Sequence, residues 1–407
     1  MGTFEYRWRA RPPLVTVDDY RTKARRSLPD MVWAYIENGA EDERTLRANR
    51  EAFSRWNLRQ RVLVGNTEAD LRTTVAGVEL ALPVILAPTG LTGLAHWSGE
   101  LGAARAAERA GTRLVLSTAS SYSIEEVGAG TASDHWFQLY AFGDRDLLAS
   151  LLDRAAAAGM SALFVTVDVP VIGNRIGERH RGMGVPPTLT PRRLLDGAIH
   201  PRWWYGLLRH QRVSARNFVE GGGARDAVRS VRIHTGAIRA DLDWDDLAWT
   251  RARWRGPLFV KGVLEPDDAA RAVDLGADGV VVSNHGGRQL NGASGSLDAL
   301  PAVVDRVGDR AEVLFDGGIR SGADVITALA LGARACLIGR PFVYGLAVAG
   351  EEGVSGVLRL LADEMNRNLL LMGCGSVAEV TRSCIAAAPA SSPSVVEDGY
   401  ARRRRRP

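Results

Sequence analysis

A histidine and an arginine stand three residues apart, with two glycines between them, in the octapeptide Ser283-Asn284-His285-Gly286-Gly287-Arg288-Gln289-Leu290. The imidazole of His285 can exchange a proton near neutral pH, and the guanidinium of Arg288 can hold a carboxylate through two parallel hydrogen bonds. The glycines let the backbone approach a ligand closely or adopt a positive φ. The octapeptide therefore predicts a site that deprotonates an anionic substrate. The alternative is a strand-to-helix turn whose polar residues only face water.

Eight short apolar runs recur along the chain, and segments with a helical pattern separate them. Strands are expected at 83–87, 113–117, 136–140, 162–167, 258–261, 279–283, 313–315 and 335–338. Helices are expected between them, among others at 99–110, 144–158, 266–275 and 322–331. Eight strand–helix units predict an α/β fold, the (β/α)8 TIM barrel, in which catalytic residues gather at the carboxyl ends of the strands.

Polar residues stand at or just after the end of nearly every predicted strand. They are Thr89, Ser117, Gln138, Tyr140, Thr166, Asp168, Lys261, Ser283, His285, Asp316 and Arg340. A barrel with a purely structural role would not require polar residues at this one end, so we expect the site here.

Two glycine-rich loops follow the seventh and eighth predicted strands. One runs from Asp316 through Gly317, Gly318 and Arg320 to Gly322, and the other is Gly339-Arg340-Pro341. Barrels of this kind hold a phosphate at these positions through backbone N–H groups and a helix N-terminus. Arg320 and Arg340 would supply the countercharge. A phosphate carried by a cofactor is expected, because the His285 site needs room for a second molecule.

The composition is that of a globular protein with a large core, since 46% of the 407 residues are hydrophobic and 24% are charged. The formal net charge is +4, part of which comes from the run 402–406, which we expect to be a solvated tail. We expect no nucleic-acid partner. Three cysteines, Cys336, Cys374 and Cys384, show no metal-binding or redox spacing, so we expect no metal and a reducing cytoplasm.

No signal peptide or membrane span is expected. The first 30 residues contain no apolar core segment, and no apolar run reaches the roughly 18–20 residues that cross a bilayer. We expect a helical segment at 1–80 that packs on the barrel, the barrel at 81–385, and a disordered basic tail at 386–407. In the first segment, Thr16-Val17-Asp18-Asp19 is a helix start signal. Tyr35 is predicted either in the core or with its hydroxyl in a polar pocket.

An insertion at 184–240, after the fourth strand, is too long for an ordinary barrel loop. Six arginines and the adjacent Trp203 and Trp204 fall within 192–216, against the single acid Asp196. This mixture is typical of a segment at a membrane surface, and we interpret it as a peripheral contact with the inner face of the membrane. A packed lid or a subunit contact would suit the same residues equally well.

Several motifs resemble the family of FMN-dependent 2-hydroxy-acid dehydrogenases and oxidases, over residues 16–385. They are SNHGGRQL at 283–290, DGGIRSG at 316–322, LIGRP at 337–341, FQLY at 137–140, TVDVP at 166–170 and LPVILAPTG at 82–90. Within the family, APTGL at 87–91, LSTAS at 116–120 and HPRWW at 200–204 are most similar to mandelate dehydrogenase, and flavin-type L-lactate dehydrogenases are also similar.

The resemblance implies a role for each matching residue. His285 would be the catalytic base, with Asp168 orienting it and stabilising its imidazolium. Arg288 and Arg175 would hold the substrate carboxylate, and Tyr35 and Tyr140 would hydrogen-bond the substrate. Lys261 would lie at the N1/O2 edge of FMN. The remaining cofactor-binding residues implied are Pro88, Thr89, Gly90, Ser117, Gln138, Thr166 and Ser283 around the ring, and Asp316, Gly317, Gly318, Arg320, Gly339 and Arg340 towards the phosphate.

The implied reaction is oxidation of an (S)-2-hydroxy acid, mandelate- or lactate-like, to the 2-keto acid, with a quinone or oxygen as the final electron acceptor. Gly90 stands where oxidases of the family often have Ala, which favours a dehydrogenase. The alternatives are an oxygen-using oxidase, or a related FMN barrel enzyme acting on another anionic biosynthetic intermediate. A flavin-binding scaffold without catalysis would leave His285 and Asp168 unexplained. We also expect a homo-oligomer, a tetramer.

Overall fold

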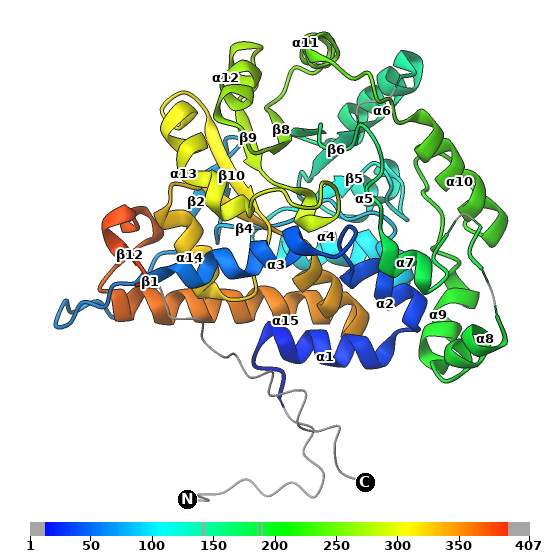
Figure 1. Cartoon of the computed structure of the whole chain (residues 1–407), viewed down its shortest axis with the longest axis horizontal. Helices are drawn as coiled ribbons and strands as arrows, with labels where there is room; N and C mark the ends of the chain where they lie inside the picture. The colour runs from blue at the N-terminus through cyan, green and yellow to red at the C-terminus, as the bar shows by residue number, and fades with distance from the viewer. Residues whose placement is uncertain (1–12, 141–142, 185, 189, 390–407) are drawn as a thin grey trace, which may run out of the picture.

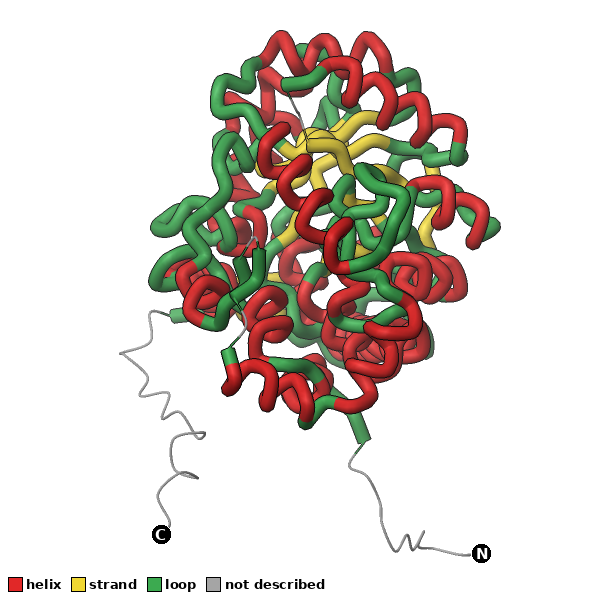
Figure 2. The backbone as a smooth tube through the Cα atoms, turned by 90° about the vertical axis from the view of Figure 1, so that its right-hand side faces the viewer, coloured by secondary structure: helices red, strands yellow, loops and turns green. Residues whose placement is uncertain are grey.

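Eight parallel strands form a ring at the centre of the computed structural model, which describes residues 13–140, 143–184, 186–188 and 190–389 (Figures 1 and 2). The strands are β4 (Val84–Leu86), β5 (Val115–Ser117), β6 (Trp136–Tyr140), β7 (Leu163–Thr166), β8 (Leu258–Val263), β9 (Gly279–Val282), β10 (Glu312–Asp316) and β11 (Ala335–Ile338). Their spatial order is β4-β11-β10-β9-β8-β7-β6-β5. A parallel bridge between Leu86 and Leu114 brings the two ends of the sheet together.

A helix follows each strand and covers the outside of the ring, as Figure 2 shows. These helices are α4 (Gly99–Arg109), α5 (Ile124–Gly130), α6 (Arg145–Ala157), α11 (Trp244–Arg253), α12 (Pro266–Asp274), α13 (Ser296–Val307), α14 (Gly322–Ala330) and α15 (Arg340–Met372). The predicted barrel is confirmed. The four predicted helices that were given bounds agree with the observed ones to within one residue at each end.

The interior of the ring is filled by large side chains. Trp136, Phe164 and Phe259 are fully buried and stack in sequence, with ring centroids 5.6 Å and 4.8 Å apart. The hairpin of β2 (Thr73–Val75) and β3 (Val78–Leu80) packs on this cluster, and the backbone N–H of Ala76 donates to the carboxylate of Glu312, the first residue of β10. The hairpin therefore covers the amino end of the ring.

The N-terminal part of the chain lies beneath the barrel in Figure 1. It contains α1 (Val17–Ser27), α2 (Asp30–Glu37), α3 (Arg44–Glu51), the 3-10 turn η1 (Ala52–Arg55) and β1 (Trp56–Leu58). The predicted start signal is confirmed, because Thr16 and Asp19 form a reciprocal capping box at α1. The strands β1, β2 and β3 are additions to the predicted helical segment.

β1 pairs antiparallel with β12 (Ile385–Ala387). The prediction of a disordered tail from 386 onward is therefore wrong for residues 386 and 387, because their backbone is paired. The rest of that tail from residue 390, including the arginine run, lies outside the described residues.

Four helices lie between β7 and α11: α7 (Ile176–His180), α8 (Pro191–Ala198), α9 (Pro201–His210) and α10 (Ala224–Ala237). The tryptophan pair predicted at a membrane surface is instead half-buried, and the Trp203 indole N–H donates to the carbonyl oxygen of Leu94 at 2.7 Å. The exposed apolar residues around α8 and α9 are Leu194, Leu195, Ile199, Tyr205 and Leu208. Within the described ranges, no helix is both long and apolar enough to cross a membrane.

Candidate active site

A cavity of about 1120 Å³ lies at the carboxyl end of the barrel strands, between the N-terminal segment and α9 and α10. Of the residues predicted for the site, those that line it are Tyr35, Pro88, Thr89, Gly90, Ser117, Tyr140, Arg175, Lys261, His285, Arg288, Asp316, Gly317, Gly318, Arg320, Gly339 and Arg340. Gln138, Thr166, Asp168 and Ser283 lie behind this wall and contact the residues that form it. The structure thus gathers the predicted residues into one region.

His285 lies on the 3-10 turn η3 (His285–Gly287), directly after β9. Its Nδ1 is 3.0 Å from Oδ1 of Asp168, and Gln289 Nε2 donates to the backbone oxygen of Asp168 at 3.0 Å. Burial alone would raise the pKa of Asp168, but the charge and hydrogen bond of His285 outweigh it and hold this pKa below its ordinary value. An ionised carboxylate behind the ring is suited to stabilise an imidazolium.

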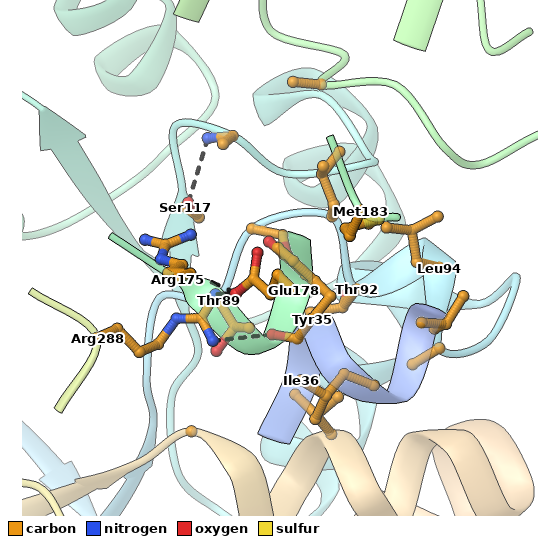
Figure 3. A pocket seen from close by; sticks show the side chains of 18 of the residues that line it. Tyr35, Ile36, Thr89, Thr92, Leu94, Ser117, Arg175, Glu178, Met183 and Arg288 are labelled. Atoms are coloured by element: carbon orange, nitrogen blue, oxygen red, sulfur yellow. Dashed lines mark hydrogen bonds and ion pairs between the residues drawn. The ribbon is translucent and has the colours of Figure 1, made fainter. Parts of the chain in front are cut away.

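Two arginines and a glutamate meet beside this pair (Figure 3). Arg288 donates through one terminal nitrogen to Glu178 Oε1 at 2.9 Å, and Arg175 Nε lies 3.9 Å from the same oxygen. The other terminal nitrogen of Arg288 donates to the carbonyl oxygens of Tyr35 and Asn38, at 2.8 Å each. Burial, and then the charge of Arg288, lowers the pKa of Arg175. Two guanidinium groups share one carboxylate, so a net positive charge remains that favours an anionic ligand.

Two tyrosines complete the polar wall. The Tyr35 hydroxyl donates to the carbonyl oxygen of Gly90 at 2.9 Å, and the Tyr140 ring meets His234 of α10 edge-on with centroids 5.1 Å apart. Burial raises the pKa of both phenols. Both therefore remain protonated at neutral pH. The Tyr140 hydroxyl can donate to a ligand, whereas the Tyr35 hydroxyl, whose one hydrogen is bonded to Gly90, can accept from one.

Lys261 is buried on β8, with Nζ 2.7 Å from Asp316 Oδ2 and donating to Ser283 Oγ at 2.9 Å. Burial would lower the pKa of this ammonium group, but the charges of Asp316 and Asp168 and the hydrogen bond to Asp316 together outweigh burial and raise the pKa. A permanent positive charge is therefore fixed at the barrel end, beside His285 and Asp168.

Several buried polar atoms at the strand ends have no hydrogen-bond partner within the described part of the chain: Gln138 Nε2, Thr166 Oγ1 and Asp316 Oδ1. They comprise an amide donor, a hydroxyl and a carboxylate oxygen, so a ligand that both donates and accepts would satisfy them. This pattern fits the polar edge of an isoalloxazine ring. The cavity also exceeds the roughly 300–1,000 Å³ usual for a single small ligand, so it fits a cofactor together with a substrate.

The two glycine-rich loops differ in their capacity to bind a phosphate. At α14, the N–H groups of Arg320 and Ser321 already donate to Asp324 Oδ2, at 2.7 Å and 3.0 Å. At α15, the N-cap residue Gly339 has no side chain that could cap the first turn, in which only Pro341 lacks an N–H. The first turn of α15 therefore offers N–H groups to an anion, as the sequence predicts for Gly339 and Arg340.

The Arg340 side chain also binds backbone carbonyl groups, a role that the sequence did not indicate. Its nitrogens donate to the carbonyl oxygens of Ile36, Glu37, Asn38 and Gly286, at 3.0–3.2 Å. Burial lowers the pKa of its guanidinium to about 10. These bonds leave one N–H on each terminal nitrogen for a phosphate.

Sequence reasoning missed Glu178, which is buried between the two arginines. It also missed His234, whose ring lines the cavity and whose pKa burial lowers to about 4. The only available signal for Glu178 was its spacing three residues after Arg175. His234 belongs to the insertion, whose position over the barrel no local pattern reveals.

Known proteins resemble this chain over nearly its whole length. A family model described as FMN-dependent dehydrogenase matches residues 24–387. The L-lactate dehydrogenase of Caulobacter vibrioides (strain NA1000 / CB15N) is 46% identical over 374 residues, which cover 90% of this chain and 96% of that protein. The structure of a monotopic membrane protein, (S)-mandelate dehydrogenase, matches with a TM-score of 0.88 and 38% identity, over 92% of this chain and 100% of that one. A mandelate oxidase mutant with (S)-mandelic acid matches with a TM-score of 0.79 and 36% identity, over 93% and 100% of the two chains.

Proposed function

The chain belongs to the family of FMN-dependent dehydrogenases, and we propose that it oxidises an (S)-2-hydroxy acid with His285 as the base and Arg175 and Arg288 as carboxylate ligands. It is an FMN-dependent oxidoreductase of lactate- or mandelate-like 2-hydroxy acids. The observation that carries the proposed roles is that the His285–Asp168 pair and both arginines line or adjoin one cavity.

FMN, when bound, supplies the acceptor for the two electrons that the hydroxy acid loses. Gln138, Thr166, Asp316 and Lys261 would hold the polar edge of its ring, as their unpaired buried atoms and fixed charge suggest. Its phosphate would bind the N–H groups at the start of α15, with Arg320 beside them.

Separate residues of the chain would bind the substrate, accept its proton and stabilise the resulting charge. Arg175 and Arg288 hold the carboxylate, and a fixed orientation of this kind removes several kcal/mol of barrier. His285 accepts a proton, for which a well-placed base contributes about 10²–10⁴-fold in rate. Asp168, 3.0 Å from Nδ1, stabilises the imidazolium that results. Tyr35 and Tyr140 would hydrogen-bond the substrate, Tyr140 as a donor and Tyr35 through its oxygen, because the Tyr35 hydrogen is bonded to Gly90.

The outer part of the cavity favours a substrate with a large apolar substituent. Leu94 and Met183 line it together with Trp203 and Leu207 of α9. A methyl group would leave much of this surface in contact with water, whereas a phenyl ring would cover it. We therefore infer that mandelate-like acids are better substrates than lactate.

For the electron acceptor we propose a quinone reached from a membrane surface, with α8 and α9 as the contact. Leu195 and Leu208 are each 68% exposed, and Arg192, Arg202 and Arg209 are exposed around them. The solved relative named as a monotopic membrane protein supports this proposal. A lid or a contact within a homotetramer is the competing role for the same surface.

The test is anaerobic mixing of the yellow holoenzyme with (S)-mandelate, (S)-lactate and the (R) enantiomer of each. We expect bleaching of the flavin absorbance by the (S) acids, faster with mandelate, and none with the (R) acids. Bleaching by neither (S) acid would contradict the proposed reaction. Reoxidation by a short-chain quinone, compared with air, then separates a dehydrogenase from an oxidase.

A further inference from the structure

The segment 38–43, which links α2 to α3, lies between the two loops that carry Arg175 and Arg288. The N–H of Ala40 donates to the carbonyl oxygen of Gly287 at 2.9 Å, one residue before Arg288. The N–H of Glu41 donates to the carbonyl oxygen of Asn174 at 2.8 Å, one residue before Arg175. One short piece of backbone is thus bonded to both loops.

The same segment also fixes the Arg288 side chain. The carbonyl oxygen of Asn38 accepts from Arg288 at 2.8 Å and from Arg340 at 3.1 Å. The last carbonyls of a helix lack partners within the helix, and here the two arginines supply them. The direction of the Arg288 guanidinium therefore depends on where the segment holds the Asn38 carbonyl.

The segment packs closely against both neighbouring loops. A Cβ atom on Gly39 would lie 2.8 Å from the carbonyl oxygen of Gly287, and one on Gly177 of α7 would lie 2.3 Å from Asn38 Nδ2. Both distances are shorter than van der Waals contact allows. A displacement of the segment towards η3 would therefore press on the backbone of Gly287, next to Arg288, and one towards α7 would press the Asn38 side chain on Gly177, near Arg175.

Glu43 holds the segment in shape. Its Oε1 accepts from Asn38 Nδ2 at 2.9 Å and from the N–H of Gly39 at 3.0 Å. Its backbone is in the left-handed region, with φ 66°, which is strained for a residue with a Cβ. The two hydrogen bonds offset this strain by closing the segment back on itself.

We propose that Glu43 is a positioning residue that sets the spacing of Arg175 and Arg288 through the segment 38–43. Glu43 does not line the cavity and acts only through this segment. The two guanidinium groups share a single counterion, Glu178, so their spacing matches a substrate carboxylate only while both loops are restrained. The inference rests on the proposed function, in which these arginines hold the substrate carboxylate.

The test compares Glu43→Leu, Glu43→Gln and the matched control Glu51→Leu, an exposed position on α3. For each holoenzyme we would measure the Kd of benzoylformate by flavin difference spectra, the KM and kcat for (S)-mandelate, the FMN content and the Tm. Glu43→Leu should raise Kd and KM about tenfold, the equivalent of about 1.4 kcal/mol, with kcat within about twofold and FMN retained. Glu43→Gln should stay near wild type, because its amide oxygen can still accept both bonds.

A second pair of variants keeps the inference testable if Glu43→Leu fails to fold. Gly177→Ala should displace the Asn38 side-chain amide, break its bond to Glu43 and so raise Kd and KM in the same direction. Gly236→Ala on α10, where a Cβ would meet no atom within 4 Å, is its control. Wild-type Kd and KM in Glu43→Leu or in Gly177→Ala would overturn the inference, as would equal losses in Glu43→Gln and Glu43→Leu. Wild-type enzyme that binds no benzoylformate and is not bleached would instead overturn the proposed function.

Discussion

His285 has a backbone conformation that residues with a side chain rarely adopt. Its φ is 58°, and Gly286 and Gly287 follow with φ of 62° and 75°. Three consecutive left-handed residues turn the chain sharply after β9. The strain at His285 persists because Asp168 and Ser283 bond its ring and its N–H. The glycines of the motif are thus explained by the turn that directs the imidazole into the cavity.

At the residue scale, we predict that His285→Gln retains FMN and the fold but reduces flavin about 10³-fold more slowly or worse. Glutamine cannot accept a proton near neutral pH, and a general base contributes about 10²–10⁴-fold. Anaerobic stopped-flow reduction by (S)-mandelate measures the rate, with His180→Gln at an exposed position as the control. A reduction rate close to that of wild type would remove His285 from the mechanism.

Replacing Arg288 with lysine should weaken both ligand binding and flavin reduction, by about 10²-fold in kcat/KM, or about 2.7 kcal/mol. An ammonium group cannot form the bidentate fork with a carboxylate, nor hold the Tyr35 and Asn38 carbonyls as Arg288 does. Steady-state kinetics of Arg288→Lys against Arg26→Lys, an exposed arginine on α1, measures the effect. Equal kinetics in the two variants would contradict the carboxylate role.

At the scale of elements, the strands and helices of the barrel follow from local signals. Buried strands appear as continuous apolar runs, and residues such as Asp316 and Lys261 were predicted because chemistry in this fold collects at strand ends. The three-residue strands β1 and β12 carry no such signal, and they pair across most of the chain length. Glu178 was missed for a related reason. Its place in the site follows from its ion pair with Arg288, a partner that is distant in sequence.

The tryptophan pair shows what composition leaves open, namely which side chains of a segment face outward. Aromatic and basic residues in 192–216 indicated a surface for membranes, but Trp203 points inward to Leu94. The apolar side chains that are exposed in this segment belong instead to leucines, such as Leu195 and Leu208. Composition does not determine which face of a helix is covered, because that depends on packing against the barrel.

We predict that the double substitution Leu195→Asp and Leu208→Asp weakens binding to anionic liposomes at low salt. Each change removes an exposed apolar side chain and adds a negative charge near a negative surface, where one charge is worth about 1 kcal/mol. Co-sedimentation measures binding. The control is Val62→Asp, because Val62 is 71% exposed but lies outside α8 and α9. Point changes are preferable to deletion of the insertion, because Trp203 and Leu207 line the cavity. Wild-type protein that stays in the supernatant would favour the lid or subunit contact.

At the scale of the whole molecule, stability should fall as the pH is lowered from about 6.5 to about 4. Burial lowers the pKa of His96, His135 and His234 to about 4, from an ordinary value of 6.5. Above pH 6.5 the imidazoles are neutral in both states, and the stabilisation is complete. Below it, the unfolded chain takes up protons that the folded protein does not, so the free energy of unfolding decreases, by about 2 kcal/mol per histidine at pH 5.

Urea unfolding of the holoenzyme at pH 7 and pH 5 checks this expectation. His135→Asn should flatten the pH dependence, since an asparagine has no proton to gain in the unfolded state. His180→Asn, an exposed position, should leave the dependence as in wild type. An identical pH dependence in His135→Asn and wild type would show that protonation of other groups causes the loss of stability.

The helices α1 and α15 lie side by side although they stand near opposite ends of the chain (Figure 1). Tyr20 of α1 fits against Gly356 of α15, where a Cβ atom would lie 2.2 Å from the tyrosine oxygen. On a ribosome that adds about 5–20 residues per second, α1 must wait roughly 20–70 seconds for its partner. Until then its apolar face has nowhere to dock, and the carbonyls at the end of α2 lack Arg288 and Arg340. The nascent chain therefore acquires its binding pocket late in synthesis.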